Sequence, residues 1–396
     1  MTDGVGEVVD PEELSARGPV RLHIVTGKGG TGKTTVAGAL ALALAAAGGD
    51  VLLVEVEGRQ GIAQVFDTPP LPYAERRVAV SEHGGAVFAL AIDPEEALLE
   101  YLELFYHLGR AGRGLRRTGL IEFATTVAPG IRDVLLTGKA YEAVRRRGTD
   151  GAHVFDAVVM DAPPTGRIAR FLNVNAEVQS LARVGPVHTQ AASMMRLFRS
   201  ERTAVHLVTL LEDLPVQETV DGVRALRAVG LPIGCVVVDA DPAVAAPGAA
   251  AALIGSGTRP VPDAARVATD LAAVGIGASD AVVADLLDLE AVRAVRAAQA
   301  DAARETLAEL GAPLVSLPRL PGGVDVGGLF DLADVLGDRL GALTGAVARP
   351  DADGDAGRPT DLSRTADAGR PADLSRTAHL SRTADAGRAD DLSRPA

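Results

Sequence analysis

The chain has 396 residues, 47% of them hydrophobic, so it is long enough to bury one large core and still carry appendages. Its formal net charge of −13 argues against a nucleic-acid partner, because no basic surface dominates. The single cysteine, Cys235, permits no internal disulfide and no cysteine metal site, which suits a reducing compartment. The acidic N-terminus has no apolar leader, and the longest apolar run, residues 36–47, is too short to cross a bilayer. We therefore expect a soluble, cytoplasmic protein without an integral membrane segment.

A glycine-rich segment, residues 27–34, fits the phosphate-binding pattern G-x-x-x-x-G-K-[ST] at every fixed position. Residues 21–25 before it resemble a buried strand, and residues 35–47 after it resemble a packed, alanine-rich helix. In such a loop the backbone N–H groups turn toward phosphate oxygens, and the helix N-terminus adds positive charge. The alternative is an ordinary glycine turn, and the match of residues 27–34 to every fixed position of the pattern argues against it. The residues expected to surround the phosphates are Gly27, Gly29, Gly30, Thr31 and Gly32.

Two side chains of this loop are expected to act directly on the nucleotide. Lys33 reaches the β- and γ-phosphates, and the hydroxyl of Thr34 binds Mg²⁺. The use of lysine supports this assignment, because only three of the 39 basic residues are lysines and two of them, Lys28 and Lys33, lie in the loop. A compact ammonium suits a phosphate site better than a planar guanidinium does. The third lysine, Lys139, is a candidate for a contact with a partner or with the nucleotide, although a solvated lysine is the simpler reading.

Short apolar runs alternate with helical patterns along the chain, as in a P-loop NTPase with a mostly parallel, doubly wound α/β sheet. The expected strands after the loop are residues 51–55, 86–92, 154–160, 204–211, 233–238 and 313–317. The expected helices between and after the later strands are residues 216–229, 290–310 and 329–343. Residues 243–277, rich in Ala, Pro and Gly, have no clear assignment.

Residues 94–147 predict an all-helical insertion dense in arginine, and residues 175–200 predict further helices. Both segments carry apolar faces. If the two faces pair into a groove, they bind a hydrophobic protein client; the simpler alternative is that they form core. The residues concerned are Leu98, Leu102, Phe105, Met194, Met195, Leu197 and Phe198.

Acidic residues follow two of the expected strands, where ligands bind in open α/β sheets. The turn of residues 55–61 is a candidate switch loop. Asp161 ends an apolar strand, as does the second acidic element of P-loop NTPases, and is expected to hold Mg²⁺ directly or through water. Gly166 lies shortly after it and is placed to offer an N–H near the γ-phosphate.

The two ends of the chain differ from the rest. Residues 1–19 are expected to form a flexible arm, and residues 20–345 the ATPase domain. In residues 346–396 arginine recurs every six positions among Asp, Ala, Ser, Thr and Gly. A hexapeptide β-helix requires an apolar residue in every turn, which several units lack, so we expect this tail to be disordered.

Taken together, these motifs resemble the ArsA and guided-entry ATPase family over about residues 20–345. The family contains arsenite-pump ATPases and targeting factors for tail-anchored membrane proteins. Residues 27–35 resemble its deviant phosphate loop, residues 161–167 resemble its second switch, and residues 318–323 resemble its adenine-flanking loop. The resemblance implies ATP and Mg²⁺ as cofactors, nucleotide contacts from Thr35, and adenine contacts from Pro318, Arg319 and Leu320.

The resemblance also implies a dimer in which Lys28 reaches the nucleotide of the partner, whether the partner is a second copy or a related subunit. Two positions depart from the family pattern. Glu57 stands where an aspartate positions the attacking water, and Asp239 stands where an asparagine faces adenine. An ionised carboxylate only accepts hydrogen bonds, so Asp239 predicts a narrower preference for ATP over GTP. The paired cysteines of metalloid-binding relatives are absent, so arsenite transport is not expected.

Three functions remain open on the sequence alone. The leading hypothesis is a dimeric, Mg²⁺-dependent ATPase whose nucleotide state moves the helical insertions and so controls a client. The second is a nucleotide-gated regulatory subunit with little turnover. The third, a metabolic P-loop enzyme or partitioning ATPase, is disfavoured by the large helical insertion.

Overall fold

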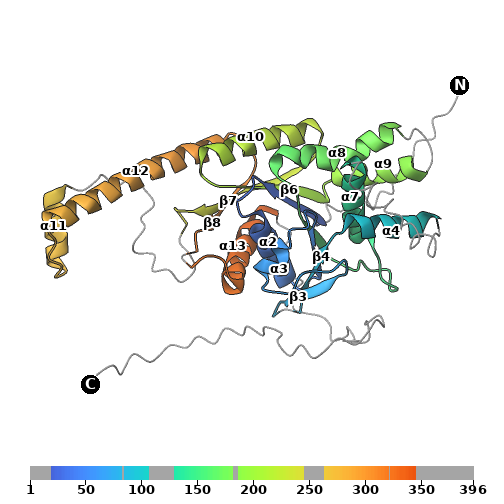
Figure 1. Cartoon of the computed structure of the whole chain (residues 1–396), viewed down its shortest axis with the longest axis horizontal. Coiled ribbons are helices and arrows are strands. Elements are labelled where there is room, and N and C mark those ends of the chain that lie inside the picture. Colours follow the sequence, from blue (N-terminus) through green and yellow to red (C-terminus); the bar gives the residue numbers. More distant parts are fainter. Residues whose placement is uncertain are drawn as a thin grey trace, which may run out of the picture. The chain divides into compact units, whose positions relative to one another are not determined.

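The computed structural model has one eight-stranded sheet with helices on both of its faces (Figure 1). It describes residues 19–82, 84–106, 129–181, 186–244, 263–320 and 322–344. The strand order is β3-β4-β2-β5-β1-β6-β7-β8, and within these residues only β3 pairs antiparallel, with β4. The predicted mostly parallel α/β sheet is therefore confirmed. The N-terminal arm up to residue 18 and the tail from residue 346 lie outside the described residues.

The strands are β1 (Leu22–Gly27), β2 (Val51–Glu55), β3 (Arg76–Val80), β4 (Ala86–Ala91), β5 (Ala157–Asp161), β6 (Thr203–Thr209), β7 (Ile233–Asp241) and β8 (Leu314–Pro318). The helices are α2 (Lys33–Ala46), α3 (Gly61–Val65), α4 (Pro94–Tyr106), α7 (Pro129–Arg145), α8 (Thr165–Leu181), α9 (Pro186–Phe198), α10 (Asp213–Ala228), α11 (Ala264–Ala273), α12 (Asp280–Ala308) and α13 (Val326–Thr344).

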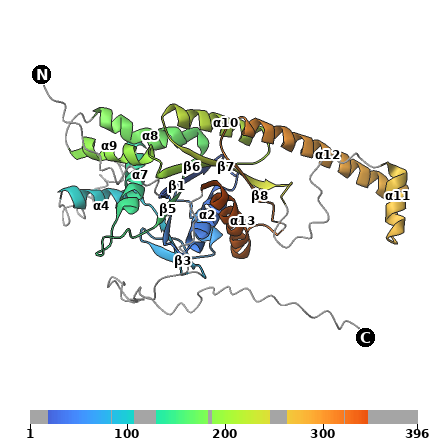
Figure 2. The same cartoon turned by 180° about the vertical axis from the view of Figure 1, so that it is seen from behind.

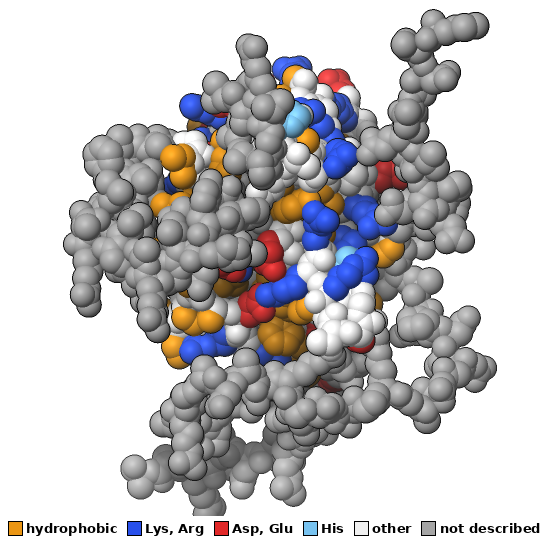
Figure 3. Space-filling model, turned by 90° about the vertical axis from the view of Figure 1, so that its right-hand side faces the viewer, with side chains coloured by type: hydrophobic (Ala, Val, Ile, Leu, Met, Phe, Trp, Pro, Cys, Tyr) orange, Lys and Arg blue, Asp and Glu red, His pale blue; other side chains and the backbone are white. Residues whose placement is uncertain are grey.

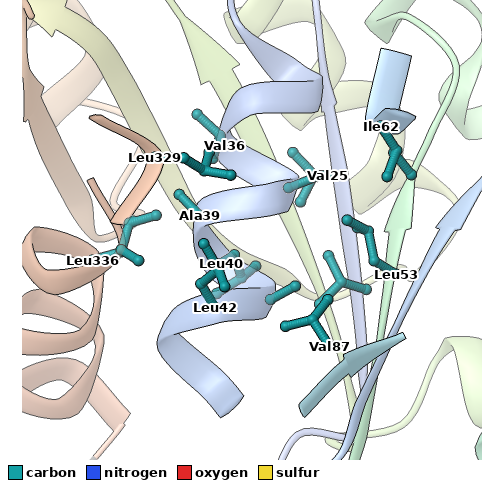
Figure 4. Packing of buried hydrophobic residues seen from close by; sticks show 14 of the residues in the cluster. Val25, Val36, Ala39, Leu40, Leu42, Leu53, Ile62, Val87, Leu329 and Leu336 are labelled. Carbon is teal, nitrogen blue, oxygen red and sulfur yellow. The ribbon is translucent and has the colours of Figure 1, made fainter. Parts of the chain in front are cut away.

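The central strands β1, β2 and β5 are buried at every residue, as expected for parallel strands that are covered on both faces. On one face α2 packs between the sheet and α13, with Val36 and Leu40 close to Leu329 and Leu336 (Figure 4). The small side chains of α2 allow this close packing. Helix α2, which follows the phosphate loop, is therefore held in the core between the sheet and α13.

The opposite face of the sheet is covered by α7, α8, α9 and α10, which share a second apolar cluster (Figure 2). Met194, Met195 and Phe198 of α9 are at most 3% exposed, so they belong to the core. The prediction that they line a client groove is therefore wrong for these three residues. Leu98 and Leu197 are partly buried against the same cluster. Leu102 and Phe105 have side chains outside the described set.

The helical insertion is tied together by charged side chains. Lys139 of α7 lies 2.8 Å from Glu100 Oε1 of α4 and 3.5 Å from Glu142 Oε2, and it is 14% exposed. Lys139 is therefore not simply solvated, and its contact with a partner or nucleotide stays a prediction. Lys and Arg side chains gather on the face of the molecule shown in Figure 3. Arg145 and Arg146 of this region stack on Tyr141 and Phe155, so they are not merely solvated.

Some elements differ from the sequence-based expectation. The half-exposed edge strand β3 was not predicted, and α11 lies within the unassigned residues 243–277. Helix α12 begins at Asp280, ten residues before the predicted start, after Ser279 accepts a hydrogen bond from the Val282 N–H. Within the described residues, no helix is long and apolar enough to cross a membrane.

Candidate active site

The phosphate loop joins β1 to α2 through a backbone that glycine makes possible. A Cβ added at Gly27 would lie 2.3 Å from the carbonyl oxygen of Val208 on β6, so a side chain cannot be accommodated there. Gly30 and Gly32 adopt φ angles of 88° and 84°, in the left-handed region that favours glycine. Gly29 is under neither constraint, because its φ is not positive and nothing lies within 4 Å of an added Cβ. Three of the four glycines are therefore required by the geometry of the loop.

The remaining loop residues are held by short-range contacts. The Thr31 hydroxyl donates to the Lys28 carbonyl oxygen at 2.9 Å, which closes the loop. Lys33 begins α2 and is only 9% exposed. Thr34 and Thr35 follow in the first helical turn and are partly buried. The N–H groups of that turn have no partner within the helix, so the turn offers donors and positive charge to an anion.

The structure brings together the two predicted ligands of magnesium. The Thr34 hydroxyl donates to Asp161 Oδ2 at 2.7 Å, across 127 residues of sequence. Asp161 Oδ1 is buried and has no hydrogen-bond partner among the described residues. Burial raises the pKa of Asp161 to about 6, although the Thr34 hydrogen bond and the charge of Lys33 lower it. Oxygen ligands suit a hard cation, and a bound cation would satisfy the orphaned oxygen. Thr34 and Asp161 therefore fit magnesium.

The acidic turn after β2 is organised by Glu55. Its carboxylate accepts hydrogen bonds from the Gln60 N–H at 2.5 Å and the Ile62 N–H at 3.0 Å, and it is 2% exposed. Glu57, the predicted water-positioning residue, is not part of this arrangement. Its Oε2 lies 3.8 Å from Arg59 Nε, and its charge is close enough to raise the pKa of Asp161 further. Glu55 therefore shapes the turn, and Glu57 is partly buried within electrostatic range of Asp161.

The segment after β5 is fastened to the phosphate-loop strand. The Ala162 N–H donates to the Val25 carbonyl oxygen at 2.9 Å. The Thr26 hydroxyl donates to the Pro163 carbonyl oxygen at 2.7 Å. Helix α8 then starts at Thr165, with Gly166 exposed in its first turn. Gly166 therefore lies at a helix N-terminus, as its predicted role near the γ-phosphate requires.

Lys28 has an ionic partner within its own chain. Its Nζ lies 3.5 Å from Glu218 Oε1 of α10, and both side chains are partly exposed. The other oxygen of Glu218 accepts a hydrogen bond from the Thr165 hydroxyl at 3.3 Å. One carboxylate thus connects the phosphate loop to the start of α8. The sequence offered no signal for this contact, because Glu218 is one of many acidic residues on helical surfaces.

Two aspartates at the end of β7 have different roles. Asp239 Oδ2 would lie 2.2 Å from a Cβ at Gly32, and its Oδ1 accepts from the Ala240 N–H. Asp241 is bound by Arg304 of α12 at 2.5 and 3.4 Å. Ala240 between them has a φ of 51°, and the register of β7 and β8 shifts there. Asp239 therefore faces the phosphate loop, whereas Asp241 is committed to an ion pair.

The predicted adenine-flanking loop begins beside this ion pair. Pro318 ends β8 in register with Asp241. Arg319 is exposed, and Leu320 is partly buried against the α2–α13 side of the core. Residue 321 lies outside the described residues. These residues share an edge of the sheet with the phosphate loop, because all the strands concerned are parallel.

A glycine-rich phosphate loop on a central parallel strand, with Thr34 and Asp161 paired at its end, defines the chain as a P-loop nucleoside triphosphatase. A family model described as anion-transporting ATPase matches residues 20–201. The ATPase BagA of Mycobacterium tuberculosis is 52% identical over 337 residues, which is 85% of this chain and 97% of that protein. The chain therefore belongs to the ArsA family of anion-transporting ATPases, and it is an ATPase.

More distant relatives match about half of the chain. The ATPase GET3 of Rhodotorula glutinis is 26% identical over 200 residues, covering 48% of this chain and 54% of that protein. The ATPase ARSA1 of Chlamydomonas reinhardtii is 28% identical over 243 residues, covering 54% of this chain and 30% of that protein. The family predicted from the motifs is confirmed.

Proposed function

We propose that this ATPase is a magnesium-dependent, cytoplasmic enzyme that hydrolyses ATP as a dimer and thereby controls a client protein. The observation that carries the magnesium dependence is the contact between Thr34 and Asp161, whose second carboxylate oxygen is buried without a partner. An ATP phosphate group would meet the N–H groups of the loop and the ammonium of Lys33.

In this proposal the residues of the chain position and stabilise, while water performs the attack. Glu57 holds the attacking water in line with the bond between the γ-phosphorus and the ADP oxygen, and accepts a hydrogen bond from that water. The water oxygen bonds to the γ-phosphorus as this bond breaks, so that ADP leaves and phosphate is released. Lys33 and the partner subunit's Lys28 neutralise the charge that develops on the phosphate oxygens. Magnesium, when bound, supplies further charge stabilisation at the same oxygens. Lys28 must leave Glu218 to reach a partner, so the ion pair at 3.5 Å represents the resting position.

The coupling to a client is proposed to run through α8. Its first residue, Thr165, lies in the segment that follows Asp161, and α8 packs against α7 and α9 of the helical region. A nucleotide-dependent shift at Thr165 would therefore move these helices. The partner in the dimer is a second copy or a related subunit, and the client is a hydrophobic protein. Crosslinking in an ATP-locked state followed by co-purification tests the client directly.

ATP is the proposed nucleotide, with Asp239 near the base. Its carboxylate accepts but does not donate, so one of two adenine hydrogen bonds is lost at a cost of about 0.5–1.5 kcal/mol. We therefore expect weaker discrimination against guanine than in relatives with an asparagine. Calorimetric affinities for ADP and GDP measure this. Strong discrimination that survives the substitution Asp239→Ala would show that another group reads the base.

Multiple-turnover phosphate release is the experiment that tests the proposed hydrolysis. We expect sustained, Mg²⁺-dependent release from ATP. Lys33→Ala should weaken nucleotide binding, whereas Lys28→Ala should abolish release while leaving binding largely intact. A single turnover without further release would favour the nucleotide-gated regulatory subunit instead.

A further inference from the structure

Helix α12 has one face that is buried at one end of the helix and exposed at the other. Five turns of an α-helix take about 18 residues, so residues that far apart point in the same direction. Leu307 is fully buried, whereas Leu289, five turns earlier, is 66% exposed. Ala300 is 4% exposed, whereas Val282, five turns earlier, is 46% exposed. Among the described residues, the face that packs on the core near α10 therefore continues without cover toward α11 (Figures 1 and 2).

Exposed apolar side chains concentrate on this part of the chain. Of the eleven large hydrophobic residues that are exposed among the described residues, seven lie between residues 274 and 295. These seven are Val274, Ile276, Val282, Leu286, Leu289, Val292 and Val295. Scattered exposed apolar residues are normal, but a contiguous group marks an interaction site.

Helix α11 does not supply the missing cover. It packs against α12, yet none of its ten residues is buried. A helix of this length is marginal in water unless an apolar face is packed. The hairpin formed by α11 and the first half of α12 (residues 263–299) therefore has apolar side chains that are not packed against other described residues.

The charges along α12 favour a second copy of this chain as the occupant. Asp285 and Asp288 lie in the outer part of α12, on the exposed face or at its flank. Arg293 and Arg296 lie closer to the core, and Arg293 also pairs with Glu290 of its own chain at 2.9 Å. Two copies that pair antiparallel about Leu289 place Arg293 of each opposite Asp285 of the other, and Val292 opposite Leu286. A two-fold contact requires this kind of self-complementarity. An anionic bilayer is disfavoured, because residues 263–299 carry six acidic and three basic side chains.

We propose that the α11–α12 hairpin is a self-association surface that pairs two copies of this chain in the absence of nucleotide. The contact is antiparallel, is centred on Leu289, and buries Leu286, Leu289 and Val292. It is separate from the contact through Lys28, so it keeps two subunits together between rounds of hydrolysis. If this contact does not exist, the proposed hydrolysis still stands, because phosphate release measures that reaction independently.

Single cysteines test the contact in protein that is otherwise unchanged. Leu289→Cys should form a disulfide-linked dimer without nucleotide, because residue 289 faces its own copy. Ala291→Cys is the matched control, since residue 291 is also exposed but lies on the opposite side of the helix. The native Cys235 is 2% exposed and should not contribute. Equal crosslinking by both variants, or none by Leu289→Cys, would overturn the proposal.

Light scattering on nucleotide-free protein provides the second test. The wild-type chain should show twice the chain mass of 40.6 kDa, and Leu289→Asp should return it to one chain. Arg293→Asp should weaken the dimer, and the added change Asp285→Arg should restore it. Nucleotide binding by each variant confirms that it has folded. A wild-type monomer at every concentration would show that something other than a second copy covers this face.

Discussion

Replacing Asp161 by asparagine should stabilise the nucleotide-free protein while removing its response to magnesium. Burial raises the pKa of Asp161 to about 6, above the value of 3.8 expected in an unfolded chain. The folded state therefore stays protonated to a higher pH than the unfolded chain. The stabilisation that comes from this proton is complete below pH 3.8 and is lost as the pH rises through 6. At 1.36 kcal/mol per pKa unit, the ionised carboxylate costs about 3 kcal/mol at pH 7.5 and about half as much at pH 5. The neutral amide of Asp161→Asn would avoid this cost and still accept from Thr34.

Urea unfolding without metal, at pH 7.5 and pH 5, measures this effect in wild type and Asp161→Asn. The variant should be more stable at both pH values, with the larger gain at pH 7.5. Adding Mg²⁺ and ADP should then stabilise wild type far more than the variant. An equal gain at the two pH values, or an undiminished magnesium response in Asp161→Asn, would refute the assignment of Asp161 as a buried carboxylate that a cation satisfies.

Three further predictions concern two residues of the site and His206, a buried residue of β6 that contacts His23 and Cys235. Gly32→Ala should lower ADP affinity in calorimetry, because φ is 84° and the new Cβ meets Asp239, whereas Gly29→Ala should not. Burial lowers the pKa of His206 to about 3, so its contribution to stability is full above pH 6.5 and lost as the pH falls toward 3. Between pH 7 and pH 4.5, the free energy of unfolding of wild type should therefore fall by about 2–3 kcal/mol more than that of His206→Gln, as measured by urea unfolding. Glu218→Gln frees Lys28 from an exposed pair worth about 0.5 kcal/mol, so phosphate release at saturating ATP should be about twofold faster with unchanged nucleotide affinity; slower release would contradict this.

Local signals in the sequence were enough to predict the phosphate loop and to single out Thr34 and Asp161, whose role as metal ligands stays a prediction. The glycine pattern, the apolar strand before Asp161 and the order of the two are short-range features, and the structure brings Thr34 and Asp161 to 2.7 Å. The central strands were also predictable, because strands that are buried on both faces are apolar throughout. Their order in the sheet depends on tertiary packing, which no single segment encodes.

Other features depend on contacts between distant residues. Glu218 meets Lys28 across the fold, and Asp241 meets Arg304, although each is an ordinary charged residue in its own segment. The apolar stripe of α9 was ambiguous for a related reason. Met195 and Phe198 have the same spacing whether they face a client or the core, and the position of α9 on the sheet places them in the core. The first ten residues of α12 were not assigned to the helix, and in the part of the chain that the structure describes their side chains Val282, Leu286 and Leu289 are exposed.

In the proposed dimeric ATPase, Lys28 acts on the partner's nucleotide, and a mixture of two inactive variants tests this role. Lys28→Ala retains a nucleotide site but lacks the lysine that reaches across, and Lys33→Ala lacks the nucleotide site but retains Lys28. If Lys28 acts across the dimer, an equal mixture forms half mixed dimers, each with one complete site, and recovers about one quarter of wild-type phosphate release. If Lys28 acts within its own chain, the mixture stays as inactive as either variant alone.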